Sequence, residues 1–169
     1  MLIKDLSGLA LDAQNKMISE LRAKGDREIG PGKWILRPLR PEDVELTTSG
    51  WLLTCSTNSA WGTFSELNTV TIDDQRFVGI NGVFYTNANP EVTQLKIEKA
   101  GRTVRHWHIQ PVPDFQNKRA WFTDPIIIDQ NTQLTVNHFN ETDTTQTKEH
   151  LGFLGYVVEP RGLVIDPIQ

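Results

Sequence analysis

The spacing of apolar side chains along the chain changes once, near residue 30. Before this point, apolar residues recur at steps of three and four, the spacing of one face of an α-helix. This stripe consists of Leu2, Leu6, Leu9, Ala10, Ala13, Met17 and Leu21. Gly25 follows the basic residues Arg22 and Lys24, a combination typical of a helix C-terminus. The pattern therefore predicts an amphipathic helix over residues 2–24.

The opposite face of this helix is polar. It includes Lys4, Asp12, Gln14, Asn15 and Lys16. A helix of this length is marginally stable alone in water, so its apolar stripe needs a surface to pack against. That surface belongs either to the chain's own domain or to a neighbouring subunit, and the sequence leaves both possibilities open.

The residues that follow the helix form a connection rich in glycine and proline. Gly30-Pro31-Gly32 interrupts the helical pattern, and neither Pro38 nor Pro41 is able to donate a hydrogen bond to a sheet. We therefore expect three parts, namely a helical arm over residues 1–30, an extended connector over 31–50 and a β-domain over 51–169.

Most of the chain after Trp34 alternates between apolar and polar residues in short runs separated by turn residues. The clearest pair is a hairpin of residues 92–99 and 103–110, joined at Ala100-Gly101. Short strands at regular spacing, without intervening helices, indicate an antiparallel β-sandwich. The expected fold is mainly β: a single jelly-roll-like sandwich preceded by the amphipathic helical arm.

Composition and charge narrow the classes of function. The net charge of the 169 residues is −4 and no dense basic cluster exists, which disfavours nucleic acid as a partner. Residues 1–24 lack the apolar run of a signal peptide, and no segment approaches the ~20 apolar residues of a membrane span. Cys55, the only cysteine, lies in an apolar run. We expect it to be a buried structural thiol and not a nucleophile.

Three histidines form a candidate metal site. His106 and His108 alternate in one predicted strand, so their side chains share a face, and His138 lies on a strand expected nearby. Three imidazoles on one face would suit zinc, iron or manganese. Gly101-x-x-x-x-His106-x-His108 resembles the start of the cupin motif, and the resemblance implies a metal-binding enzyme. Gln110-Pro111-Val112-Pro113 stands where cupins place a glutamate, so this interpretation stays an alternative and we expect no cofactor.

Two further sites come from exposed segments. Trp61, in the turn-rich segment 58–62, is the best candidate for an exposed tryptophan that stacks on a sugar ring. Glu141 and Asp143 lie in the threonine-rich segment 140–149, which is expected to be an exposed loop. No apolar residues nearby would shift the pKa values of this acid pair, so we expect no catalytic role for it.

The whole pattern resembles capsid decoration (cement) proteins of tailed bacteriophages, which have a jelly-roll body and an N-terminal arm. The resemblance rests on the helix over residues 2–21, the proline-containing connector, the strand series and the closing segment 152–160. It implies a non-enzymatic virion structural protein, assembled in the host cytoplasm, that stabilises a capsid by bridging neighbouring shell subunits.

The same resemblance implies a homo-oligomer, commonly a trimer, with the major capsid protein or another virion protein as partner. The residues expected to contact that partner are those of the arm stripe, namely Leu2, Leu6, Leu9, Ala13, Met17 and Leu21. A lectin-like or host-binding virion protein is a further alternative, since Trp61 suits sugar binding.

Overall fold

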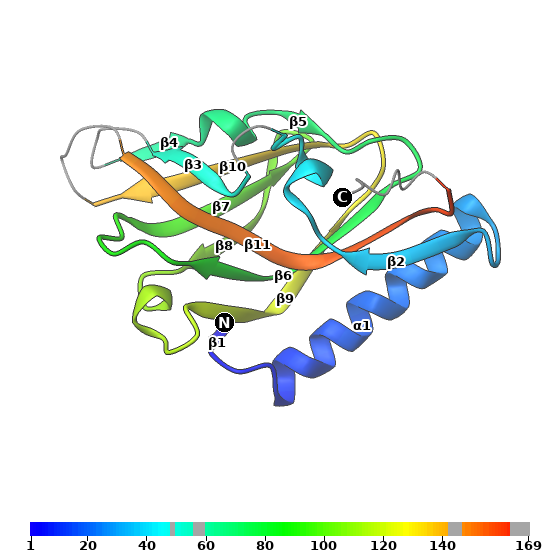
Figure 1. The fold of residues 1–169 in the computed structure, drawn as a ribbon, viewed down its shortest axis with the longest axis horizontal. Helices are drawn as coiled ribbons and strands as arrows, with labels where there is room; N and C mark the ends of the chain where they lie inside the picture. Colours follow the sequence, from blue (N-terminus) through cyan, green and yellow to red (C-terminus); the bar gives the residue numbers. More distant parts are fainter. Residues whose placement is uncertain (48–49, 56–59, 142–146, 163–169) are drawn as a thin grey trace.

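A computed structural model describes residues 1–47, 50–55, 60–141 and 147–162 (Figure 1). Two antiparallel sheets face each other as a sandwich, and helix α1 (Gly8–Lys24) lies along the outside of one of them. The predicted fold class, a mainly β sandwich with an N-terminal helix, is confirmed. No helix in the described ranges is long and apolar enough to cross a membrane.

The first sheet has the strand order β1-β9-β6-β11-β2, and β3 pairs with another part of β11. Its strands are β1 (Leu2–Ile3), β2 (Trp34–Pro38), β3 (Leu52–Cys55), β6 (Phe77–Tyr85), β9 (Arg119–Ile128) and β11 (Thr147–Pro160). The second sheet has the order β4-β10-β7-β8, and β5 pairs with β10. Its strands are β4 (Trp61–Thr63), β5 (Val70–Thr71), β7 (Val92–Lys99), β8 (Arg102–His108) and β10 (Gln133–Asn140).

The orders β2-β11-β6-β9 and β4-β10-β7-β8 are those of a jelly roll, in which the chain crosses repeatedly from one sheet to the other. Short helical turns lie between the strands, namely η1 (Gly25–Ile29), η2 (Pro41–Val44), η3 (Ser65–Leu67) and η4 (Val112–Asp114). The predicted hairpin is present as β7 and β8. Ala100 and Gly101 at its turn both have positive φ angles, 50° and 76°, as a tight two-residue turn requires.

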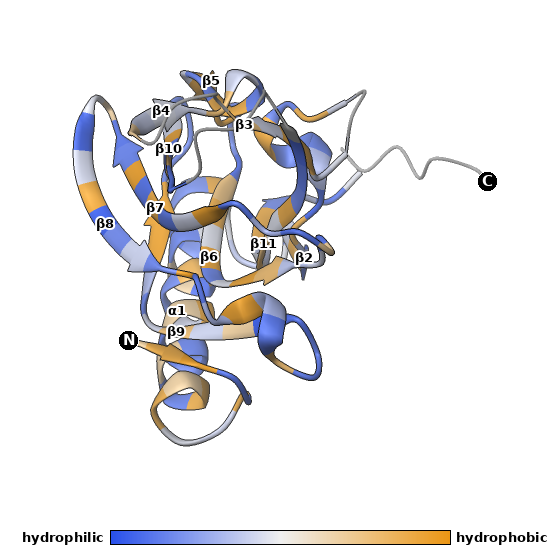
Figure 2. Ribbon diagram, turned by 90° about the vertical axis from the view of Figure 1, so that its left-hand side faces the viewer, coloured by the Kyte–Doolittle hydropathy of each residue, from blue (hydrophilic) through white to orange (hydrophobic). Residues whose placement is uncertain are grey.

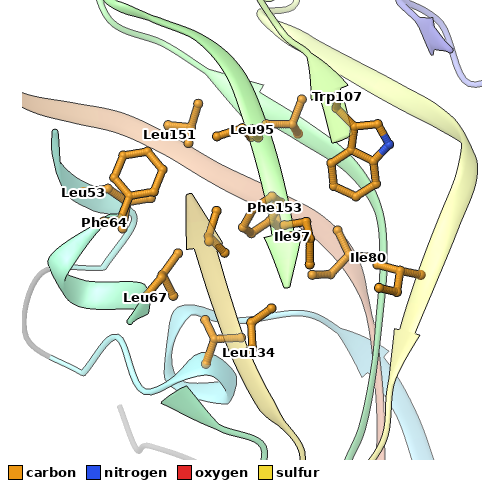
Figure 3. Packing of buried hydrophobic residues seen from close by; sticks show 14 of the residues in the cluster. Leu53, Phe64, Leu67, Ile80, Leu95, Ile97, Trp107, Leu134, Leu151 and Phe153 are labelled. Atoms are coloured by element: carbon orange, nitrogen blue, oxygen red, sulfur yellow. The ribbon is translucent and has the colours of Figure 1, made fainter. Parts of the chain in front are cut away.

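The main core fills the space between the two sheets (Figure 3). Leu95 and Ile97 of β7 and Phe153 of β11 supply fully or almost fully buried side chains from opposite sheets. The Trp107 ring stacks on Phe122 of β9, with 3.6 Å between ring centroids. Side chains that alternate along each strand therefore divide into one set in this core and one set on an outer face.

The N-terminal helix differs from the predicted one at both ends. Leu2 and Ile3 form β1 beside β9, so α1 begins only at Gly8. Gly25 does not end the helix, because its backbone stays helical and the chain continues through the π-helical turn η1 to Gly30, where φ is 121°. Gly25 serves instead to admit the Trp34 ring, since a Cβ atom there would lie 2.8 Å from Trp34 Cδ2.

The second half of α1 packs on the outer face of the chain's own first sheet. Met17 and Leu21 are buried against Phe77 and Val158. Gln14, predicted on the polar face, is also buried, because its side-chain oxygen accepts a 2.7 Å hydrogen bond from Asn81 Nδ2 in β6. At this half of the helix, the surface that the apolar stripe needs is therefore supplied by the same chain.

The expected extended connector belongs to the sandwich. Its first part is β2, which pairs with β11, and its second part is the 3₁₀ turn η2. The Arg37 guanidinium donates to both carboxylate oxygens of Asp43, at 2.6 and 2.7 Å, and to Glu159 at 2.6 Å. Arg76 Nε donates to the same Glu159 carboxylate at 3.0 Å. This ion network, with Asp43 and Glu159 almost fully buried, joins the connector to β11.

Side chains of the second sheet cover part of the edge of β9 in the first sheet. Arg105 Nε donates to the Asp124 carbonyl at 2.9 Å, and an Arg105 Nη donates to the Pro125 carbonyl at 3.2 Å. Lys99 Nζ donates to the Ile127 carbonyl at 3.2 Å. The two sheets are thus joined along this side by hydrogen bonds as well as by the apolar core.

Candidate functional site

The outer face of the second sheet combines aromatic and polar side chains. Strand alternation turns every second residue of β4, β7, β8 and β10 outward, away from the apolar core. The register places His106 of β8 and Asn137 of β10 on either side of Lys96 in β7. Figure 2 shows these strands side by side at the left of the molecule. The face carries Trp61, Thr63, Gln94, Lys96, Glu98, His106, His108, Asn137 and Phe139.

Trp61 is the largest side chain of this outer face and is 37% exposed. Its ring centroid lies 5.5 Å from that of Phe139 and 5.3 Å from that of His106, both in edge-to-face orientations. The Lys96 ammonium lies 3.7 Å from the Trp61 ring centroid, close enough for a cation–π interaction. Neighbouring strands therefore hold the indole in place while leaving part of it open to solvent.

Polar groups line an open hollow of about 310 Å³ beside Trp61. Thr63 Oγ1 donates to Asn137 Oδ1 at 2.6 Å, and Asn137 Nδ2 donates to Glu98 Oε1 at 2.6 Å. This chain of hydrogen bonds fixes the Asn137 amide and the Glu98 carboxylate next to the aromatic ring. An apolar platform beside oriented donors and acceptors suits a small ligand that has both an apolar face and many hydroxyl groups.

His106 and His108 lie on this outer face as a stacked pair. Their ring centroids are 5.0 Å apart and their planes differ by 28°. His106 Nε2 lies 2.7 Å from Gln94 Oε1. Because that oxygen only accepts, Nε2 is the donor in this arrangement. Partial burial, and then the neighbouring His108 and Lys96 charges, lower the pKa of His106.

His138 does not join the other two histidines. It pairs with Leu95 and points into the core, whereas His106 and His108 point outward from the same sheet. Its ring packs 4.5 Å from that of Phe64, and burial lowers its pKa to about 4. The expectation of three imidazoles on one face is therefore wrong. Among the described residues, no three His, Cys, Asp or Glu side chains are grouped to bind a metal ion.

Cys55 is buried, as predicted. Its Sγ atom lies 3.5 Å from His138 Nδ1, an arrangement that could suggest an activated thiol. Burial, and then the negative charges of Glu149 and Glu91, raise the pKa of Cys55 to about 12. The thiol therefore stays protonated at neutral pH beside a neutral imidazole, so the pair lacks the thiolate that nucleophilic catalysis needs.

The residues of the predicted arm stripe occupy different environments. Met17 and Leu21 are buried, Leu2, Leu6 and Ala13 are half-buried, and Leu9 is 62% exposed. Leu9 and Ala13 line an open groove of about 640 Å³ between α1 and β9. Charged side chains of both signs, namely Asp12, Lys16, Glu20, Arg105 and Asp124, also line it. Only the first turns of the stripe are thus accessible to another molecule.

The predicted threonine-rich loop is partly strand. Asn140 ends β10, and Glu149 lies in β11, where its carboxylate is fully buried and accepts a 3.0 Å hydrogen bond from the Tyr85 hydroxyl. Of the candidate acid pair, Glu141 is exposed and accepts a 3.3 Å hydrogen bond from Thr93 Oγ1, whereas Asp143 lies outside the described residues.

The sequence singled out Trp61 and placed His106 and His108 on one face, but it did not indicate that Trp61 lies beside these histidines. The structure adds Lys96, Asn137 and Phe139 to the same face. Alternation in residues 92–99 already indicated an outward Lys96, whereas the pairing of β4 with β10, which brings Trp61 onto Phe139, left no signal in the sequence.

Known protein families show no match to this sequence, and neither do curated proteins.

Proposed function

We propose that this protein is a non-enzymatic carbohydrate-binding protein that holds its ligand on the outer face of the second sheet, around Trp61. The observation that carries the proposal is the partly exposed Trp61 ring, held against Phe139 and His106 next to the hydrogen-bonded Asn137 and Glu98 side chains. A sugar ring presents C–H groups on one face and hydroxyl groups around its edge, and these match the indole and the polar side chains.

Two other properties support a sugar over other ligands. The hollow is open and shallow, which suits one or two residues of a chain that extends into solvent. The net charge of −4 disfavours nucleic acid, whose phosphates need a larger excess of basic residues. Lys96 lies on a flexible stem, so its ammonium is free to leave the indole and donate to a ligand oxygen.

A glycan array followed by titration calorimetry tests this proposal. We expect the wild-type protein to bind a restricted set of glycans, and binding to quench tryptophan fluorescence. Trp61→Ala should weaken binding by about tenfold or more, since tryptophan truncation at a binding centre typically costs about 2 kcal/mol. Trp61→Phe, which keeps an aromatic ring, should retain part of the affinity.

Trp121→Ala is the matched control, because Trp121 is a half-buried tryptophan of the other sheet. It should leave glycan binding unchanged. Circular dichroism of each variant checks that the fold is intact. If the wild-type protein bound no glycan, or if Trp61→Ala bound as tightly as wild type, the proposal would be wrong.

A second candidate is the structural role in a virion, as a decoration protein that bridges neighbouring shell subunits. The observation that favours it is the exposed apolar side chains at the N-terminal side of the molecule, namely Met1, Leu9 and Leu11. Such side chains are often covered in an assembly. In this role only the first turns of α1 would contact a partner, since Met17 and Leu21 are packed against the chain's own first sheet.

Light scattering tests this candidate through the mass in solution. A trimer that Leu9→Asp converts to a folded monomer would support subunit packing through this helix face. Asp12→Asn, a neighbouring change that removes no apolar contact, serves as control. A monomeric wild-type protein that is also absent from native particles seen by electron microscopy would exclude the candidate.

A further inference from the structure

The proposed sugar-binding face has an uneven distribution of charge. Lys96, His106 and His108 gather on the side of Trp61 nearer to β8. Trp61 and Thr63 of β4 and Asn137 and Phe139 of β10 add no charge there. Lys96 has a permanent positive charge near neutral pH, and each imidazole is able to take up another proton.

Two acidic groups lie near this cluster, and each accepts a hydrogen bond from a neutral side chain. Glu98, two residues after Lys96 on the same face of β7, lines the same hollow and accepts the 2.6 Å hydrogen bond from Asn137 there. Glu141, after β10, accepts from Thr93 Oγ1. Arg105, directly before His106 in β8, donates to carbonyl groups at the edge of β9 and so points away from this face. His106 and His108 are exposed and Lys96 is half-buried over Trp61, and neither carboxylate accepts a hydrogen bond from these three groups within the described part of the chain.

We propose that the ligand is an acidic glycan whose carboxylate or sulfate group lies between Lys96 and the His106–His108 pair while a sugar ring stacks on Trp61, and that binding strengthens as the pH falls. This inference rests on the proposed carbohydrate-binding function and specifies the class of its ligand. Lys96 supplies charge at every physiological pH, whereas the histidines supply charge only when protonated.

The direction of the pH effect follows from linkage. In the free protein, partial burial and the positive neighbours His108 and Lys96 lower the pKa of His106. An anionic group bound among these side chains offsets the repulsion between the positive charges and raises the pKa of His106. The complex therefore takes up protons as it forms. Reciprocity then requires that protons favour the anionic ligand. A neutral glycan offers no such coupling.

A glycan array that contains neutral, carboxylate-bearing and sulfated glycans, probed at about pH 8 and about pH 5.5, tests the inference. We expect acidic glycans to be preferred and their binding to be about five- to tenfold tighter at the lower pH, the effect of one added charge contact. The carboxylated and sulfated arms show which anionic group is recognised. Calorimetry in buffers of different ionisation enthalpy should show proton uptake on binding.

Two variants locate the effect. Lys96→Gln should weaken binding of acidic glycans at both pH values. The double variant His106→Gln/His108→Gln should lose the pH dependence, so that its affinity for an acidic glycan is the same at the two pH values. His150→Gln, at an exposed histidine of β11, is the matched control and should retain the pH dependence.

The possible failures are distinct. Binding of neutral glycans with equal affinity, or a pH dependence unchanged in the double variant, would overturn the acidic-ligand inference and leave the proposed function standing. Absence of binding to every glycan would overturn both. Preferential binding of a single-stranded oligonucleotide over any glycan would also overturn both, because phosphate would then be the anion recognised.

Discussion

Gln14 in α1 accepts a 2.7 Å hydrogen bond from the side-chain amide of Asn81 in β6, across 67 residues of sequence. Both side chains are buried beneath the helix. Gly79, two residues before Asn81, has no side chain, and a Cβ atom there would lie 2.8 Å from Met17 Sδ. Helix and sheet thus approach closely and are joined by a specific polar contact, which makes α1 part of the folded body.

Gln14→Ala should therefore lower the free energy of unfolding by about 1–3 kcal/mol, because it leaves the buried Asn81 amide without this acceptor. Asn15→Ala, one position away on the exposed side of α1, should change it by less than about 0.5 kcal/mol. Urea denaturation monitored by tryptophan fluorescence measures both. Equal and small effects would mean that the helix contributes little to stability.

Arg37→Met should destabilise the protein by about 3–5 kcal/mol, since it leaves the carboxylates of Asp43 and Glu159 buried without their main partner. The hydrogen bonds with Asp43, and then with Glu159, outweigh burial and raise the pKa of Arg37, so this guanidinium is charged at any accessible pH. Arg22→Met, on the exposed surface of α1, is the control. Thermal unfolding provides the measurement, and similar melting temperatures for the two variants would contradict the assigned role of the network.

His138 should make the protein less stable in mild acid. The unfolded imidazole takes up a proton near pH 6.5, whereas burial lowers the folded pKa to about 4. Between these two pH values the unfolded state binds more protons than the folded state. The free energy of unfolding therefore decreases as the pH is lowered, by about 3 kcal/mol over the whole interval. Denaturation curves from about pH 8 to about pH 4 should show a smaller fall for His138→Gln than for His150→Gln. Parallel curves for the two variants would rule out this contribution.

The Cys55 thiol should be almost unreactive in the folded protein. Burial is the main cause of a pKa raised to about 12, so little thiolate exists at about pH 8. A thiol reagent such as dithiobis(nitrobenzoate) should react slowly in buffer and rapidly in urea. The double variant Ser7→Cys/Cys55→Ala, whose thiol would be exposed, should react rapidly in both. Rapid labelling of the native wild-type protein would indicate that the thiol is accessible.

The jelly roll could be predicted because strand alternation and turn residues are local signals. The Val92–Lys99 strand and its Ala100-Gly101 turn appear in the structure as expected. The helix start was missed for a tertiary reason, since Leu2 and Ile3 find partners in β9 more than a hundred residues away. Gln14 was assigned to solvent for the same reason, because its burial depends on Asn81 in another element.

The candidate site was predictable only in pieces. Trp61 was expected to be exposed, and the histidines of β8 were expected to share a face. The prediction placed His138 with the other two histidines, which is wrong. His138 follows the buried Leu134 and Val136 at steps of two residues, and this spacing puts the three side chains on the same, inward face of the strand. The meeting of Trp61 with Lys96 depends on the register of three strands that no local pattern sets. Sequence reasoning therefore found single residues but not their grouping.

The basic side chains along the edge of β9 have a consequence for how the protein behaves at high concentration. The carbonyl groups of Asp124, Pro125 and Ile127 already accept hydrogen bonds from Arg105 and Lys99. An extended segment from another molecule would have to displace these donors before it could extend the sheet here. These side chains therefore oppose the addition of a further strand at this part of the β9 edge, the step by which sheets grow into fibrils.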